Sequence, residues 1–172
     1  VLSLVGSEMC IRDRARFEGS RVVFADGSDA EVDLVVFATG YLAGFPFLDP
    51  AVLDVRDDRP SLALNMVPAT YDTLAVMGLY QPDSGVFAIA HWQGVLVAEL
   101  FSAAMTSPGQ SRRIRQRVLE PLRGSTSTSR TLSGGVRFAS STRHYFEVSH
   151  QEYLRALDTT IQRVRRARME AA

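Results

Sequence analysis

The chain has 172 residues, 46% hydrophobic and 22% charged, a composition typical of a globular domain with a sizeable core. Its 19 basic and 19 acidic residues give no electrostatic basis for binding nucleic acid. The single cysteine, Cys10, excludes an internal disulfide framework and a multi-cysteine zinc site, which favours a cytoplasmic setting. The apolar stretches fall short of the roughly 20 residues of a membrane span, so we expect no membrane partner.

Residues 1–14, VLSLVGSEMCIRDR, fit poorly with the sequence that follows. The string SLVGSEMCIRDR resembles translated sequencing-adapter read-through at the broken ends of metagenomic gene sequences. We therefore expect this segment to be an artefact or disordered, and the chain to be a fragment. The alternative is a genuine short strand from Val1 to Val5. In either case Cys10 has no neighbouring base that would make it a catalytic thiol.

The front of the sequence predicts a β-hairpin that leads into a buried strand. Residues 15–18 and 21–24 alternate around Gly19-Ser20, and a second turn signal, Asp26-Gly27, follows. The apolar run from Leu34 to Ala38 does not alternate, which is typical of a strand buried on both faces of a parallel sheet. It ends in Ala-Thr-Gly, where a backbone without a Cβ can approach a ligand at the end of a strand.

The middle of the sequence predicts short strands followed by a helix. Apolar runs at 62–67, 74–79 and 86–90 are bounded by turn residues and predict strands. Residues 92–106 carry apolar side chains at a helical period, and Ser107-Pro108 ends that helix.

The tail predicts two more helices on either side of a loop. Residues 111–120 indicate a short basic helix ending at Pro121, and the Ser/Thr/Gly-rich stretch 123–135 indicates a mobile loop. A capping box at 149–152 predicts a helix that starts at about residue 150. Its apolar stripe consists of Tyr153, Leu157, Ile161 and Val164, and its terminal arginines are expected to be solvated.

Two blocks carry a family resemblance. The run from DGS through EVDLVVFATGY to FPFLD resembles the closing segment of the NADPH domain in flavoproteins with two dinucleotide-binding domains. The Ala-Thr-Gly-Tyr form with Phe-Pro-Phe-Leu is similar to flavin-containing monooxygenases and the related Baeyer–Villiger enzymes. In that family the segment returns from the NADPH domain to the FAD domain and passes near the flavin. The resemblance therefore implies that Ala38, Thr39, Gly40 and Tyr41 bind cofactor.

The second block, MVPATYDTLAVMGLYQPDSGVFAIAHWQGVLVAELFSAAM, resembles the family segment that completes the FAD domain. There the start of a helix lies against the pyrimidine side of the isoalloxazine ring, where N–H groups and the helix dipole suit negative charge. This implies that Trp92, Gln93 and Gly94 face the flavin or the substrate. His91 stands where many members carry an acidic residue. The alternatives are that Trp92 packs in the core and that His91 is a hydrogen-bonded structural histidine.

The resemblance implies an α/β fold, the C-terminal part of a Rossmann-like flavoprotein with two dinucleotide-binding domains. The expected organisation is an artefact or disordered 1–14, the end of the NADPH domain and return crossing at 15–47, and the FAD-domain part at 48–122. A loop at 123–135 and an extended segment with a helix at 136–172 complete it.

The implied function is that of an FAD- and NADPH-dependent monooxygenase. It would oxygenate a small organic substrate with O₂ through a C4a-(hydro)peroxyflavin, and we expect the fragment alone to be inactive. The cofactor carries the chemistry, so no catalytic side chain and no metal site are predicted. The resemblance also allows the full-length protein to form a homo-oligomer. The alternatives are a fragment of another FAD- or NAD(P)H-dependent oxidoreductase and a small non-catalytic α/β binding domain.

Overall fold

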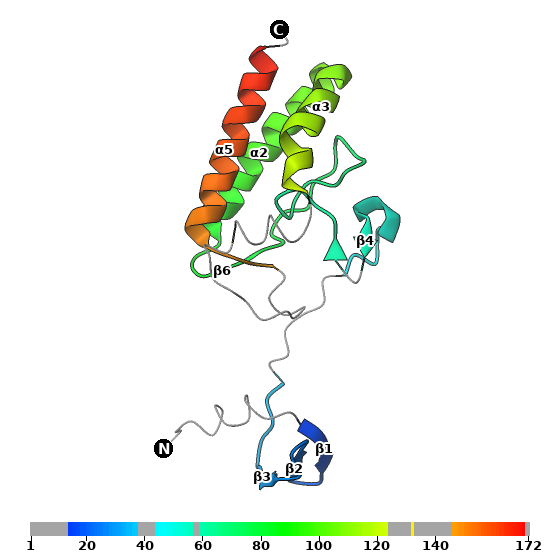
Figure 1. Cartoon of the computed structure of the whole chain (residues 1–172), viewed down its shortest axis with the longest axis vertical. Coiled ribbons are helices and arrows are strands. Elements are labelled where there is room, and N and C mark those ends of the chain that lie inside the picture. The colour runs from blue at the N-terminus through cyan, green and yellow to red at the C-terminus, as the bar shows by residue number, and fades with distance from the viewer. Residues whose placement is uncertain (1–13, 38–43, 57–58, 124–131, 133–145, 171–172) are drawn as a thin grey trace. The chain divides into compact units, whose positions relative to one another are not determined.

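The structure, a computed structural model, describes residues 14–37, 44–56, 59–123, 132 and 146–170 (Figure 1). The chain divides into two compact units, residues 1–40 and 41–172. The residues Ala38–Tyr41 that the sequence singles out lie outside the described residues, as do residues 1–13 and most of the predicted loop at 123–135.

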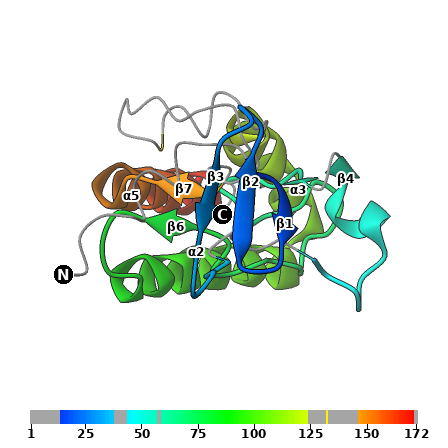
Figure 2. The ribbon, with the colours of Figure 1, turned by 90° about the horizontal axis from the view of Figure 1, so that it is seen from below.

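The first unit contains a small antiparallel sheet with strand order β1-β2-β3, whose strands lie side by side in Figure 2. The strands are β1 (Arg14–Glu18), β2 (Arg21–Phe24) and β3 (Asp29–Glu31). Gly19 and Gly27 adopt φ of 60° and 84° in the two connections, a backbone conformation that glycine accepts without strain. Val22 and Phe24 are buried, whereas the intervening Val23 is only partly covered. The predicted hairpin is therefore confirmed.

The predicted buried strand after this sheet is wrong for the described residues, because 32–37 form no strand. Leu34, Val36 and Phe37 are 77%, 73% and 68% exposed. A strand buried on both faces needs neighbouring strands and covering layers, and the described part of this unit offers only a three-stranded sheet that ends at Glu31. The apolar run is thus left without the sheet that its composition predicts.

The second unit is mainly helical, and α2 (Phe87–Thr106), α3 (Pro108–Ile114) and α5 (His150–Met169) pack against one another (Figure 1). A π-helical turn, η2 (Arg115–Leu119), and a 3₁₀ turn, η3 (Glu120–Leu122), continue the chain after α3. The predicted basic helix at 111–120 is therefore shared between three short elements. The remaining elements are short: η1 (Pro50–Leu53), β4 (Val55–Arg56), β5 (Arg59–Pro60), β6 (Gln81–Pro82) and β7 (Glu147–Val148).

The three strands predicted in the middle of the sequence are also wrong. At 62–67 the chain reverses through Leu64 and Asn65, which adopt φ of 53° and 54°, so that Ala63 bridges Val67. Residues 74–79 are irregular and turn at Gly78, where φ is 81°. Residues 87–90 belong to α2, because Ile89 extends the helical period of the buried residues Gln93, Leu96 and Leu100.

The core of this unit lies between α2 and α5. The predicted apolar stripe of α5 is confirmed, since Tyr153, Leu157, Ile161 and Val164 are fully buried. They pack in one cluster with side chains that include Leu96 of α2. Burial of this stripe holds the two helices together, because each fully buried large apolar side chain contributes about 1.5–3 kcal/mol.

Contrary to the expectation from the sequence, α2 is long and apolar enough to span a membrane by length and composition alone. It has 20 residues, and an 18-residue window within it has a mean hydropathy of 1.3. A single helix of this kind is weak evidence of a membrane span, and 28% of the window, including Leu96, Leu100 and Ala103, is buried inside this unit. The criterion therefore does not assign α2 to a membrane.

Helix α5 starts at the predicted place but not with the predicted cap. Ser149 precedes the first turn, yet its side chain makes no capping hydrogen bond. Instead the carboxylate of Asp83 accepts a hydrogen bond of 2.9 Å from the His150 N–H. Parallel pairing of β6 with β7 brings Asp83 beside this helix start. The donor is thus satisfied by a residue distant in sequence, which a local capping motif does not reveal.

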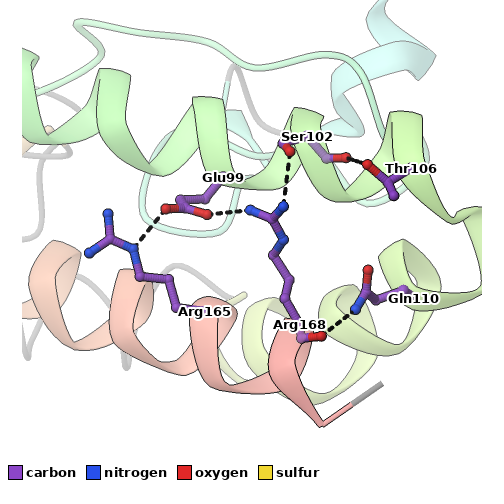
Figure 3. A network of polar contacts seen from close by, with 6 residues as sticks. All are labelled: Glu99, Ser102, Thr106, Gln110, Arg165 and Arg168. Carbon is purple, nitrogen blue, oxygen red and sulfur yellow. Dashed lines mark hydrogen bonds and ion pairs between the residues drawn. The ribbon is translucent and has the colours of Figure 1, made fainter. Parts of the chain in front are cut away.

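An ion-pair network joins the C-terminal halves of α2 and α5 (Figure 3). Both oxygens of Glu99 are paired, with Arg165 Nε at 2.7 Å and with Arg168 Nη1 at 2.5 Å. Arg168 also donates to the Ser102 hydroxyl at 3.0 Å, and its carbonyl accepts from Gln110 of α3 at 2.8 Å. The network therefore ties all three helices together at this end.

The first prediction concerns the pH dependence of this network. The hydrogen bond from Arg165 is the main cause that lowers the pKa of Glu99 below its ordinary value. Glu99 therefore stabilises the fold above the ordinary glutamate pKa of about 4.3, and this contribution is lost as pH falls through the lowered folded value. Glu99→Gln should lower stability by about 1 kcal/mol near pH 7, with a difference from wild type that disappears in acid. Urea unfolding at several pH values measures it.

Glu170→Gln, at the exposed end of α5, is the matched control and should change the pH dependence little. A Glu99→Gln variant with the wild-type pH profile would show that the network contributes no pH-dependent stability.

Candidate functional site

The first turn of α2 has backbone N–H groups for which the described part of the chain provides no hydrogen-bond partner. The first hydrogen bond of the helix runs from the Ala90 N–H to the Val86 carbonyl, so the N–H groups of the preceding turn have no partner within the helix. Val86 provides no side-chain cap, and the first turn carries no acidic residue. The positive end of a 20-residue helix is therefore not neutralised by its own side chains.

Large apolar side chains are exposed around the same helix start. Phe87 is 87% exposed, Val86 45% and Trp92 36%. Met77, from the irregular segment before β6, is 49% exposed and lies near Gly94 of α2. The ring of Trp92 meets that of His91 edge to face, with centroids 5.5 Å apart. Exposed aromatic and aliphatic groups of this size in and beside the first two turns of a helix indicate a binding or packing surface.

Gln93, predicted to face the cofactor, instead points into the protein. Its side chain is fully buried. Its Oε1 accepts a hydrogen bond of 3.0 Å from the Gly78 N–H, and its Nε2 donates to the Tyr153 hydroxyl at 2.9 Å. Tyr153 in turn donates to the Leu64 carbonyl at 2.5 Å. The amide of Gln93 thus joins the Met77–Gly78 turn to α5 within this structure.

The network ends on a strained turn. Leu64 and Asn65 are non-glycine residues in the left-handed region, a conformation that costs L-residues roughly 1–2 kcal/mol each and that Asn tolerates best. The surrounding structure must hold Leu64 in place, and it does so by burying its side chain and by the bond from Tyr153. The turn, the glycine at 78 and the start of α2 are therefore fixed by one set of contacts.

The other predicted site residues near α2 lie at its surface. The Trp92 side chain is at the surface rather than in the core, and Gly94 is partly covered. His91 is exposed and contacts Trp92. Sequence reasoning placed Tyr153 in the apolar stripe of α5 and did not find its hydroxyl contact. The helical period predicts that the Tyr153 ring is buried, but no local signal in the sequence pairs residue 153 with residue 93.

Tyr80 gives the helix start a second support. Its hydroxyl donates to the Val86 carbonyl at 3.0 Å, and its ring packs edge to face on that of Tyr153 with centroids 5.6 Å apart.

Among the described residues no group of three or more His, Cys, Asp or Glu side chains could hold a metal ion. Backbone donors, aromatic rings and a methionine suit a planar, partly apolar ligand whose negative charge meets the helix start.

Comparison with known proteins assigns the chain to a family. The chain belongs to the flavin-binding monooxygenase-like family, whose model matches residues 4–133. Members of this family use FAD and NADPH. The family resemblance drawn from the sequence is therefore confirmed. The match ends before α5, so Tyr153 lies outside it.

The individual relatives are much longer than this chain. Flavin-containing monooxygenase 5 of Cavia porcellus is 37% identical over 98 residues, which is 55% of this chain and 18% of the relative. Dimethylaniline monooxygenase (N-oxide-forming) 2 of Rattus norvegicus is 37% identical over 93 residues, 52% of this chain and 17% of the relative. The 4-hydroxybenzoate brominase (decarboxylating) of Marinomonas mediterranea is 36% identical over 94 residues, 54% and 18%. The chain thus spans less than a fifth of these relatives. No solved structure matches.

The second prediction concerns Gly94. A Cβ built at this position meets only the Met77 methyl group, at 3.9 Å, an ordinary contact with the flexible end of a side chain. Gly94→Ala should therefore stabilise the chain by about 0.5–1 kcal/mol, the helix-propensity difference between the two residues. Urea unfolding measures the gain.

A gain would mean that packing within this chain does not require the glycine, which leaves close approach of a ligand or another segment as its role. A loss of stability would contradict this and assign Gly94 to internal packing against Met77.

Proposed function

We propose that this chain is the C-terminal portion of an FAD- and NADPH-dependent monooxygenase that oxygenates a small organic substrate with O₂. Its own contribution is the surface at the start of α2, against which the flavin ring or the substrate lies. The observation that carries the proposal is the exposure of Met77, Val86, Phe87 and Trp92 in and beside the first two turns of α2, whose first N–H groups have no partner among the described residues, in a chain of the flavin-binding monooxygenase-like family.

The residues at this helix start fit a flavin. An isoalloxazine ring has an apolar body and a pyrimidine edge that is negatively charged when reduced. The free N–H groups and positive helix end complement that edge, while Phe87 and Trp92 offer apolar and aromatic surface to the body of the ring. FAD supplies the redox and oxygen-activating chemistry when bound. The chain's own residues orient the ring and exclude water from it.

The site proposed from the sequence is therefore kept with one change of role. Trp92 and Gly94 remain flavin- or substrate-side residues, and Ala38, Thr39, Gly40 and Tyr41 remain proposed cofactor contacts. Gln93 contributes by fixing the Met77–Gly78 turn rather than by offering its side chain to a ligand, because both ends of its amide are engaged inside the protein.

The composition of α2 supports its place inside a larger protein. Apolar residues surround the whole circumference of this helix, and a helix of that kind in a globular protein is covered on all sides. Within this chain α3 and α5 cover one side, while Phe87 at one end and Met105 at the other are 87% and 84% exposed. We propose that the rest of the flavoprotein covers them, in a cytoplasmic enzyme without a membrane partner.

The chain alone should not turn over. Its 172 residues contain no G-x-G-x-x-G sequence, the fingerprint that places a dinucleotide pyrophosphate on a helix start. Without such a loop neither FAD nor NADPH is held by its phosphates, and the surface at α2 contacts only the ring end of a cofactor.

The third prediction tests this assignment in the full-length protein that contains this chain. It should purify with bound FAD and consume NADPH and O₂ in the presence of a substrate, because we propose that the remaining sequence supplies the two nucleotide-binding fingerprints. Trp92→Ala should weaken FAD retention about 10-fold or more, as the loss of a buried aromatic contact does. Flavin absorbance after dialysis measures it.

Met105→Ala is the matched control, an exposed apolar residue at the opposite end of the same helix, and should retain FAD like the wild type. A full-length protein that neither binds FAD nor oxidises NADPH would contradict the assignment. Equal FAD retention by both variants would contradict the placement of the flavin at the start of α2.

A further inference from the structure

We propose that Tyr153 of α5 is a positioning residue for the site at the start of α2, acting through Gln93 on the Met77–Gly78 turn. The inference rests on the proposed function for the role of that site, but the contacts that carry it do not depend on any ligand. It places one determinant of the site on a helix beyond the part of the chain that the family model matches.

The direction of every hydrogen bond in the network is fixed. The Gly78 N–H can only donate, so it faces Gln93 Oε1, and the other end of the amide is therefore the donor Nε2. The Tyr153 hydroxyl accepts from Nε2 and uses its single proton toward the Leu64 carbonyl. Without the hydroxyl the amide would lose its acceptor and be free to turn away from Gly78.

The inner part of the network is enclosed, whereas Gly78 at its outer end is exposed. Gln93 and Tyr153 have 0% exposure, and Leu64 has 1%. Burial raises the pKa of Tyr153 well above its usual range, so the hydroxyl keeps the proton that it donates to Leu64. Gln93, Tyr153 and the Leu64 carbonyl therefore form one buried, connected hydrogen-bond network.

The contacts of Tyr153 reach both parts of the site. Through Gln93 it fixes Gly78, and the adjoining Met77 is the exposed residue that lies against Gly94. Through ring contact it supports Tyr80, whose hydroxyl bonds the Val86 carbonyl at the helix start. Loss of the Tyr153 hydroxyl should loosen the Met77–Gly78 turn. It should leave Tyr80 in place, because a phenylalanine ring still packs on Tyr80.

The experiment is amide hydrogen exchange of the ¹⁵N-labelled chain, read at Gly78 and normalised to core amides such as Leu96 and Ile161. Tyr153→Phe should accelerate exchange at Gly78 relative to the core by about 10-fold, the effect of losing one partly buried hydrogen bond. A merely structural role would accelerate all these amides together and leave the ratio unchanged. Tyr71→Phe, at an exposed tyrosine, is the matched control and should leave the ratio at the wild-type value.

Coupling is tested with Gln93→Met, which removes the acceptor of the Gly78 N–H while keeping an apolar side chain of similar length. It should also accelerate exchange at Gly78. Adding Tyr153→Phe to it should produce no further acceleration, because the hydroxyl acts on Gly78 only through Gln93. An additive double variant, or an unchanged ratio in Tyr153→Phe, would overturn the proposal.

If the Tyr153→Phe chain does not fold, a second measurement tests the same contact. Incorporation of 3-fluorotyrosine keeps the ring in place and alters the hydrogen-bonding strength of the hydroxyl. The Gln93 side-chain amide and the Gly78 resonance should both shift, and unshifted resonances would overturn the proposal. A full-length protein without FAD, in which Gly78 still responds to Tyr153→Phe, would refute the proposed function and leave this inference standing.

Discussion

The amide of Gln93 lies in the interior between α2, α5 and the turn at Gly78, and it imposes the constraint on which the rest of the helical unit depends. A buried amide that loses its partners costs about 1–3 kcal/mol, so both of its ends must be satisfied at once. Tyr153 and Gly78 can satisfy them only in one relative position of the two segments. Apolar packing alone would allow α2 and α5 to rotate or slide against each other. The two hydrogen bonds of Gln93 do not allow this, because they form only at one relative position of the helices.

The ion pairs at the other end of the helices complement this constraint. Glu99 accepts from Arg165 and Arg168 at the partly exposed end of the same interface, where we expect the network to contribute about 1 kcal/mol. The buried end therefore sets the register and the exposed end adds to it. With its inner face fixed in this way, α2 leaves Phe87 and Trp92 exposed, and we propose that a cofactor and the rest of a flavoprotein cover them.

Sequence reasoning succeeded where the signal is local. The glycine turns of the front sheet, the period of α5 and the proline that ends α2 each depend on neighbouring residues, and each was confirmed. The failures have non-local causes. Short apolar runs such as 62–67 do not distinguish a strand from a tight turn, and the exposed 32–37 lacks the sheet that its composition calls for. Gln93 was recognised as important through family resemblance, but its partner Tyr153 lies 60 residues away and on another helix.

The central claim, that the Gln93 side chain is an internal tie rather than a ligand contact, is tested most directly by NMR of its side-chain amide in the folded chain. The account predicts two resolved, slowly exchanging Nε2 protons with nuclear Overhauser contacts to the Tyr153 ring, because Nε2 lies 2.9 Å from the Tyr153 oxygen. Nε2 protons that exchange as in a free glutamine and show no contact to residue 153 would contradict it. In that case the amide would be available to a ligand, as the sequence alone suggested.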